Sequence, residues 1–222
     1  MTQVLLTGFG AWAGSDANPS GLVAHAFEGK TLAGAQVSVV TPPNYFKEMI
    51  PFTAAEIDRL KPDVVIMMGE FCGRGLITVE RLGQNLIDAT RYGMGDSAGE
   101  RPQGEPVVPG GPAAYYATLP IRAMVKAMRE AGIPADISDT GGTFGCNLLM
   151  YGVLHHIAVN KLPIRAGWVH LPSLPATAAL DENLGLPSMA LETQIAGLEA
   201  GIIAAVEHPT DIDVPIKSNF QL

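Results

Sequence analysis

One cysteine stands where a predicted strand gives way to an apolar helix. Cys146 follows the glycine-bearing turn at residues 141–145 and precedes Asn147 and a run of apolar residues at helical spacing. A thiol at a helix N-terminus faces unpaired backbone N–H groups and the positive end of the helix dipole, and both favour the nucleophilic thiolate. The position therefore predicts a nucleophile. The alternative is a buried structural cysteine, because free cysteines are among the most buried residues.

A histidine closes the next predicted strand. A cysteine nucleophile needs a base within hydrogen-bond reach and a third group that orients the base. His170 ends the predicted strand Ala166–His170, and Cys146 follows the predicted strand Ala135–Asp139. We expect these strands to be adjacent and parallel, so that both side chains reach the carboxyl edge of the sheet, where α/β proteins bind ligands. The other four histidines are expected to pack or to face solvent: His25, His155, His156 and His208.

Three carboxylates are candidates for orienting the imidazole of His170. Glu80 ends the short predicted strand LITVER at 76–81, and Glu70 and Asp88 lie nearby in the chain. A carboxylate beside an imidazole holds its tautomer and stabilises the imidazolium. The residues alone leave this choice open, because Glu80 could equally form a surface ion pair with Arg81 or Arg74.

A second motif favours a different class of protein. GFGAWA at residues 8–13 fits the dinucleotide fingerprint G-x-G-x-x-G/A and follows a predicted strand. A loop follows the motif where the fingerprint requires a helix, and no acidic residue ends the second strand. A non-catalytic nucleotide-binding α/β protein is thus the alternative function. Phe9 and Trp12 instead offer two rings, either for the core or as a wall for a small flat ligand.

Strands and helices alternate along most of the chain. The predicted strands are Gln3–Phe9, Ala35–Thr41, Val64–Met68, Ala135–Asp139 and Ala166–His170. The predicted helices are 19–27, 45–60, 121–131, 146–159 and 188–206. This alternation predicts a three-layer α/β/α fold with a mostly parallel, twisted sheet. Residues 76–81 and 85–88 interrupt it and are expected to form a short antiparallel excursion.

The chain is expected to form one catalytic domain over residues 1–222. Residues 90–112 are rich in glycine, proline and charge, and a loop of this length inside a compact domain is typically functional. It could close over the site. Residues 209–222 are expected to be a loose tail or a contact to another subunit.

Composition excludes several classes of function. The 14 lysines and arginines are scattered in a chain of net charge −8, which disfavours nucleic-acid binding. No apolar stretch approaches the roughly 18 residues of a membrane helix. Two distant cysteines form no disulfide framework, so a cytoplasmic protein is expected. Metal-ligand motifs are absent, so neither a metal nor another cofactor is expected. The low charge favours a homo-oligomer.

Motifs along most of the chain resemble those of the pyroglutamyl peptidase type I (pyrrolidone-carboxylate peptidase) family. They are LLTGF with an aromatic residue three positions later, NPS at 18–20, MGEFCGRGLITVER at 68–81, N-x-x-D-A at 85–89, GERPQGEP at 99–106, GGPAAYYATLP at 110–120, SDTGGTFGCN at 138–147, WVHLP at 168–172 and PSMALE at 187–192. Their order along the chain agrees with the family. This agreement is more specific than any single triad.

The resemblance implies a cysteine peptidase that removes an N-terminal pyroglutamate from small peptides without metal or cofactor. It places the catalytic triad on Glu80, Cys146 and His170. It also implies that Phe9, Trp12 and Phe144 form aromatic walls around the lactam ring. A divergent hydrolase that acts on another N-terminally blocked peptide or amide is the related alternative.

Three positions depart from the family pattern. Trp12 stands where the family usually has phenylalanine, and Thr90 stands where an oxyanion-stabilising arginine is expected. Arg91 is expected to replace that arginine after a shift in register. Glu70 stands where many members have a glutamine that faces the ring, and its carboxylate is expected either to accept the lactam N–H or to alter specificity. Cys72 is expected to be a packed or incidental thiol.

Overall fold

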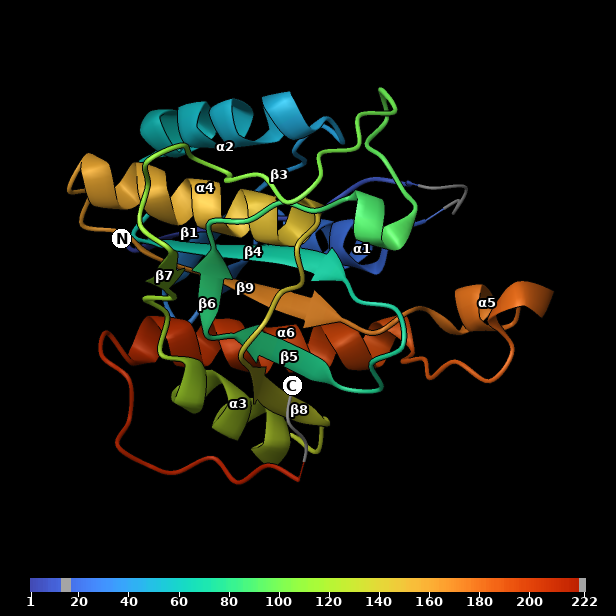
Figure 1. The fold of residues 1–222 in the computed structure, drawn as a ribbon. Coiled ribbons are helices and arrows are strands. Elements are labelled where there is room, and N and C mark those ends of the chain that lie inside the picture. The colour runs from blue at the N-terminus through green and yellow to red at the C-terminus, as the bar shows by residue number, and fades with distance from the viewer. Residues whose placement is uncertain (13–16, 220–222) are drawn as a thin grey trace.

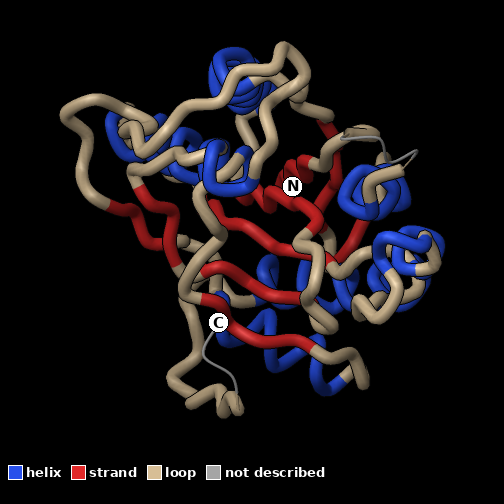
Figure 2. Tube along the Cα trace, turned by 45° about the vertical axis from the view of Figure 1, so that its right-hand side comes forward, coloured by secondary structure: helices blue, strands red, loops and turns tan. Residues whose placement is uncertain are grey.

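A seven-stranded sheet lies between two layers of helices in the computed structural model, which describes residues 1–12 and 17–219 (Figure 1). Figure 2 shows the same sheet in red with blue helices on both sides. Its strands are β1 (Gln3–Thr7), β2 (Thr31–Leu32), β3 (Ala35–Val40), β4 (Val64–Glu70), β5 (Ile77–Glu80), β8 (Ala135–Ser138) and β9 (Arg165–Leu171). They lie in the order β2-β3-β1-β4-β9-β5-β8. The predicted three-layer fold is confirmed.

The sheet is parallel in its centre and changes direction at β5. Strands β3, β1, β4 and β9 are parallel, whereas β5 pairs antiparallel with β9 and parallel with β8. The predicted adjacency of the strands that precede Cys146 and end in His170 is therefore wrong. Strand β5 separates β8 from β9, and β8 runs against β9. Residues 139–144 carry the chain from the end of β8 across to the helix that holds Cys146.

Helices cover both faces of the sheet (Figure 1). Helices α1 (Pro19–Ala26), α3 (Ile121–Glu130) and α6 (Leu191–Glu207) pack on one face. Helices α2 (Phe46–Leu60) and α4 (Gly145–Val159) pack on the other. Alternate residues of each strand enter the two cores, as the pleat requires, so the strands read as continuous apolar runs. Leu5 packs under α2 and α4, for example, and Leu6 packs under α1 and α6.

This alternation also decides which polar residues share a face. Met67 and Trp168 belong to the core under α4. Gly69 and His170, two residues further along the same strands, face the same way. Val79 faces the opposite core, so Thr78 and Glu80 also face α4. The register aligns His170 with Gly69 on one side and with Thr78 on the other.

The middle of the chain differs from the prediction in one strand. The predicted strand at 85–88 is wrong, because the antiparallel excursion is a separate sheet of β6 (Leu82–Gln84) and β7 (Ala114–Tyr116). Ile87 makes an isolated bridge to Glu105. Asn147 explains this placement, because its side-chain amide bonds to the backbone of Gln84 and Leu86 at 2.8–2.9 Å.

Side-chain hydrogen bonds anchor the long loop and the C-terminal segment. Within residues 90–112, the buried carboxylate of Asp96 accepts hydrogen bonds from the N–H groups of Phe46, Ala98 and Glu100 at 2.9 Å. After α6, Asp211 accepts from the backbone N–H groups at the start of α3 at 3.1 Å. The described part of the tail is thus docked onto α3, and residues 220–222 lie outside the described chain.

The remaining elements are short. They are the helix α5 (Pro175–Ala178) and the 3-10 turns η1 (Thr90–Tyr92) and η2 (Asp181–Asn183). In residues 1–12 and 17–219, every helix is too short or too polar to cross a membrane.

Candidate active site

Cys146 is the second residue of α4. The helix begins at Gly145, and its first backbone hydrogen bond runs from Leu148 to the carbonyl of Phe144 at 2.9 Å. The N–H groups of Gly145, Cys146 and Asn147 thus lack an acceptor within the helix, which makes this terminus a site for a developing negative charge.

Gly69 makes room for the thiol. A Cβ atom on Gly69 would lie 2.7 Å from Sγ of Cys146 and 2.8 Å from Cζ2 of Trp168. No side chain fits there, so the sulfur rests directly on the backbone of β4. His170 is the register partner of Gly69 on β9, one strand away. The fold therefore brings the predicted nucleophile and the predicted base together through β4, not through the end of β8.

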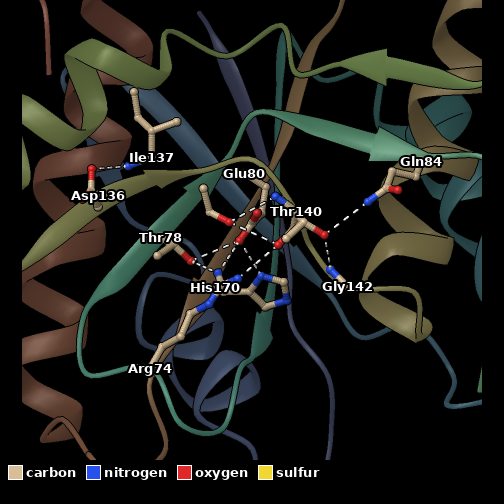
Figure 3. Close-up of polar contacts among 10 residues, drawn as sticks. Arg74, Thr78, Glu80, Gln84, Asp136, Ile137, Thr140, Gly142 and His170 are labelled. Atoms are coloured by element: carbon tan, nitrogen blue, oxygen red, sulfur yellow. Dashed lines mark hydrogen bonds and ion pairs between the residues drawn. The ribbon is translucent and has the colours of Figure 1, made fainter. Parts of the chain in front are cut away.

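Glu80 orients the imidazole of His170 (Figure 3). The Nδ1 atom of His170 lies 2.8 Å from Oε1 of Glu80, and both side chains are at most 1% exposed. Because an ionised carboxylate only accepts hydrogen bonds, Nδ1 carries the proton and Nε2 is left as the basic nitrogen. Of the three carboxylates that the sequence left open, Glu80 is the one that contacts His170.

The other two carboxylates have different partners. Asp88 caps the 3-10 turn, accepting from the hydroxyl of Thr90 at 2.7 Å and from the N–H of Arg91 at 3.2 Å. Glu70 accepts a hydrogen bond from the Cys72 thiol at 3.5 Å. Since residues alternate along β4, Glu70 points to the face opposite Gly69 and Cys146.

Burial dominates the ionisation of the site. Loss of solvent and, to a smaller extent, the nearby Glu80 carboxylate raise the pKa of the Cys146 thiol to about 12, against the lowering effect of its own backbone N–H. Burial also lowers the pKa of His170 below its ordinary value. The hydrogen bond and charge of His170 and the charge of Arg74 outweigh burial at Glu80 and lower its pKa. At neutral pH the site holds a thiol, a neutral imidazole and a carboxylate. The effect of the helix start on the thiol is smaller than that of burial, which corrects the expected thiolate.

Aromatic rings gather in front of Cys146. Phe144 stacks on Trp12 with ring centroids 4.8 Å apart and planes 8° apart. Phe46 and Tyr92 meet Phe144 edge-on at 5.2 and 5.8 Å. Phe9 lies deeper and packs against Trp168 at 6.0 Å. The sequence had pointed to Phe9, Trp12 and Phe144, but it gave no reason to include Phe46 and Tyr92, which come from distant segments.

Arg91 and Cys72 lie outside this cluster. Arg91 is exposed, and its guanidinium lies 5.8 Å from the ring centroid of Tyr92. Its contribution to an oxyanion site stays a prediction. Cys72 is exposed and bonds weakly to Glu70 and Ser173.

Gly8, the first glycine of the fingerprint-like motif, packs closely against α1, as does Gly21 on α1 against Phe9. A Cβ on Gly8 would lie 2.2 Å from the carbonyl oxygen of Ser20, and one on Gly21 would lie 2.4 Å from that of Phe9. Both glycines therefore serve the close packing of the β1 end on α1. The hydroxyl of Ser20 accepts from the N–H of Phe9 at 3.0 Å. Ala13, the last residue of the motif, lies outside the described residues.

Sequence reasoning missed Thr78 in the buried network and named Arg74 only as a possible surface partner of Glu80. Arg74 donates through Nη1 to Oε1 of Glu80 at 2.7 Å and to the hydroxyl of Thr78 at 2.6 Å (Figure 3). Thr78 in turn donates to the same carboxylate oxygen at 3.1 Å. The available signal was the alternation in ITVE, which places Thr78 and Glu80 on one face. Among the described histidines, cysteines and acidic residues, no group of three or more is placed to hold a metal ion.

Several known proteins are similar to this chain along most of its length. A family model described as pyroglutamyl peptidase matches residues 2–208. The chain is 54% identical to a pyrrolidone-carboxylate peptidase of Mycobacterium tuberculosis H37Rv over the full length of both chains. It is 46% identical to a pyrrolidone-carboxylate peptidase 2 of Photorhabdus laumondii, over 94% of each.

Solved structures give the same result. The pyroglutamyl peptidase I of Bacillus amyloliquefaciens superposes with a TM-score of 0.91 at 33% identity, covering 96% of this chain and 100% of the other. The pyrrolidone carboxyl peptidase of Thermococcus litoralis also reaches a TM-score of 0.91, at 34% identity, covering 97% and 100%.

Proposed function

The chain belongs to the pyroglutamyl peptidase family, and from that premise we propose that Cys146, His170 and Glu80 are its catalytic residues. The family predicted from the sequence motifs is confirmed. The enzyme is a cysteine peptidase of the pyroglutamyl peptidase I type, which removes an N-terminal pyroglutamate from peptides. One observation supports the residue assignment: the sulfur of Cys146 rests on Gly69, the register partner of His170, and Glu80 holds Nδ1 of His170.

The ionisation states set the order of the proton transfers. His170 Nε2 takes the proton of the Cys146 thiol as Sγ attacks the carbonyl carbon of the pyroglutamyl residue. The attack forms a C–S bond, and the carbonyl oxygen becomes an oxyanion. When the oxyanion collapses, the C–N bond breaks, and the imidazolium returns the proton to the leaving amine. Water then hydrolyses the thioester with His170 again acting as base, which releases pyroglutamate and restores the thiol.

Two groups stabilise charge during these steps. The N–H groups of Gly145, Cys146 and Asn147 face the developing oxyanion, with the exposed Arg91 assigned a supporting part. Glu80 stabilises the imidazolium, because its carboxylate accepts from Nδ1.

The substrate pocket in this proposal is aromatic. Phe9, Trp12 and Phe144 provide flat apolar walls, which suit a lactam because its nitrogen carries no positive charge. Glu70 is assigned the role of accepting a hydrogen bond from the lactam N–H. For this role its carboxylate must leave Cys72 and turn to the face of β4 that carries Cys146.

The wider setting of the enzyme is also part of the proposal. We infer a single catalytic unit over residues 1–222, supported by one central sheet and a family match to residues 2–208. A cytoplasmic location follows from two free cysteines, and a net charge of −8 disfavours nucleic acid as a partner. Self-association through apolar surface is the remaining proposal, and the anchored segment 209–219 is one candidate contact.

The related alternative is a preference for another N-terminally blocked substrate. The observation that favours it is the set of departures from the family pattern at Trp12, Glu70 and Thr90, while Glu80, Cys146 and His170 agree with that pattern. Comparing turnover of pyroglutamyl, prolyl and acetyl amides separates the two substrate classes.

The decisive experiment replaces Cys146 by serine. Release of a chromogenic amine from a pyroglutamyl amide is expected to fall by at least about 10⁴-fold, as for loss of other catalytic nucleophiles, while the circular dichroism spectrum stays unchanged. Cys72→Ser is the matched control and is expected to keep wild-type kcat and KM, because the Cys72 thiol is exposed and contacts only Glu70 and Ser173. Retention of the wild-type rate by Cys146→Ser would refute the nucleophile assignment.

A further inference from the structure

Arg74 is a buried guanidinium with no place in the reaction described so far. It lies in the turn between β4 and β5 and is 8% exposed. Its Nη1 atom donates to Glu80 and Thr78, and its Nη2 atom donates to the carbonyl oxygen of Thr140 at 3.1 Å (Figure 3). An arginine enters a core only when its donors are satisfied, so this position is built for the guanidinium.

The Thr140 contact ties Arg74 to the segment that leads to the nucleophile. The carbonyl oxygen of Thr140 also accepts a hydrogen bond from the hydroxyl of Ser138 at 3.1 Å. The side-chain hydroxyl of Thr140 accepts one from the N–H of Gly142 at 3.2 Å. Residues 139–144 have to cross from the end of β8 to the start of α4. Nη2 of Arg74 holds this crossing segment at Thr140, while Nη1 of Arg74 holds Glu80.

A stacking contact ties Arg74 to the base as well. The guanidinium lies 3.7 Å from the ring centroid of Phe71, and Phe71 meets the imidazole of His170 edge-on at 5.1 Å and 85°. One side chain therefore touches the orienting carboxylate, the aromatic ring against the base, and the strand-to-helix crossing that carries the nucleophile.

The charges of Glu80 and Arg74 also link Arg74 to the site. A fully buried carboxylate is unstable without a paired cation, and Arg74 is the cation that pairs with Glu80. The positive charge of Arg74 lowers the pKa of both Cys146 and His170, whereas the negative charge of Glu80 raises the pKa of Cys146. The charge of Arg74 thus offsets part of the effect that Glu80 has on ionisation of the thiol.

We infer that Arg74 is a positioning residue for this reaction: its guanidinium clamps Glu80 to the Thr140 carbonyl and, through Phe71, braces His170. Arg74 acts on the imidazole and on the nucleophile segment without touching the substrate. The inference rests on the proposed roles of Cys146, His170 and Glu80. It assigns to the β4–β5 turn a function in catalysis as well as in folding.

The test is a double-mutant cycle with Glu80. Arg74→Met is expected to lower kcat about 100-fold and to leave KM within about threefold, because the lost contacts align the reacting groups and not the substrate. In a Glu80→Gln background the same change is expected to cost clearly less than in the wild-type background, because the ion pair with Glu80 is already lost and only the contacts with Thr140 and Phe71 remain to be removed. Arg59→Met, which breaks an exposed ion pair with Glu56 on α2, is the matched control and is expected to have wild-type kinetics.

The pH profile separates positioning from a general loss of stability. Removing a positive charge that lowers the pKa of His170 and Cys146 is expected to move the acid limb of kcat/KM to higher pH. Arg74→Lys keeps the charge but not the two-nitrogen clamp. The acid limb of its kcat/KM profile is expected to stay at the wild-type pH, while kcat falls about tenfold. If Arg74→Met does not fold, Arg74→Lys replaces it in the cycle.

The possible results are distinguishable. Two results would overturn the inference. One is an equal loss of kcat from the Arg74 change in the wild-type and Glu80→Gln backgrounds. The other is an Arg74→Met variant with wild-type kcat and a wild-type acid limb of kcat/KM. If instead the wild-type enzyme does not hydrolyse pyroglutamyl amides, or Cys146→Ser remains active, the proposed function fails first.

Discussion

Glu80, His170 and Arg74 lie in or beside the central strands and are at most 8% exposed, whereas the rings in front of the thiol come from loops and helix ends, with Tyr92 39% exposed. The buried region is joined by hydrogen bonds of 2.6–2.8 Å with defined donors and acceptors. The rings in front of the thiol form the mouth of the site and belong to Trp12, Phe46, Tyr92 and Phe144. Their centroids lie 4.8–5.8 Å apart, and they come from segments far apart in the chain.

This contrast assigns chemistry to one region and selectivity to the other. A buried hydrogen-bonded network tolerates few substitutions, because each loss leaves an unpaired polar group. Ring contacts tolerate exchange of one apolar residue for another at a modest free-energy cost. Trp12, which departs from the family pattern, lies among the rings, whereas Glu80 and His170 lie in the buried network. Three further substitutions test whether the division holds.

Glu80→Gln tests the buried region and is expected to have the largest effect. The amide keeps the shape but loses the charge that stabilises the imidazolium. The expected loss in kcat/KM is therefore about 10³–10⁴-fold, mostly in kcat. Steady-state kinetics on a pyroglutamyl amide measures it. Glu199→Gln, at an exposed carboxylate on α6, is the control. A loss confined to KM would contradict the division.

Phe144→Leu tests the mouth. The change removes the stacking on Trp12 but keeps an apolar side chain beside the thiol. KM is expected to rise about tenfold with kcat within about threefold, because a lost ring contact is worth roughly 1 kcal/mol of binding. Phe52→Leu, on the exposed side of α2, controls for loss of a surface ring. If kcat falls and KM stays unchanged, Phe144 belongs with the buried region.

Asp96→Ala tests whether an anchor outside the mouth holds its rings in place, and it is expected to have the smallest effect. Asp96 accepts from the first N–H of α2, and that residue, Phe46, packs against Phe144. Losing this cap is expected to lower the free energy of unfolding by about 1–2 kcal/mol and to raise KM only a few-fold. Urea unfolding measures the first quantity. Glu100→Gln, in the exposed pair with Lys47, is the control. An unchanged unfolding midpoint would show that the loop does not need this anchor.

Much of the fold could be predicted because its signals are local. Apolar strands alternating with helices predicted the layers, and Cys146 and His170 were placed at element ends that the structure confirms. The neighbours of these elements could not be predicted. The short strand β5 inserts between β9 and β8, and nothing in its sequence states whether it runs parallel or antiparallel.

The sequence by itself predicted the layers and the family, because residue order and motifs suffice for these, and it named the three residues of the proposed triad. The tertiary structure decided where these residues lie. Gly69 of β4, the register partner of His170, leaves room for the sulfur of Cys146. Glu80 reaches His170 because β5 runs antiparallel beside β9. The role of Arg74 depends on contacts with Glu80, Thr140 and Phe71, and the one to Thr140 spans 66 residues of the chain, so only the packed fold could reveal it.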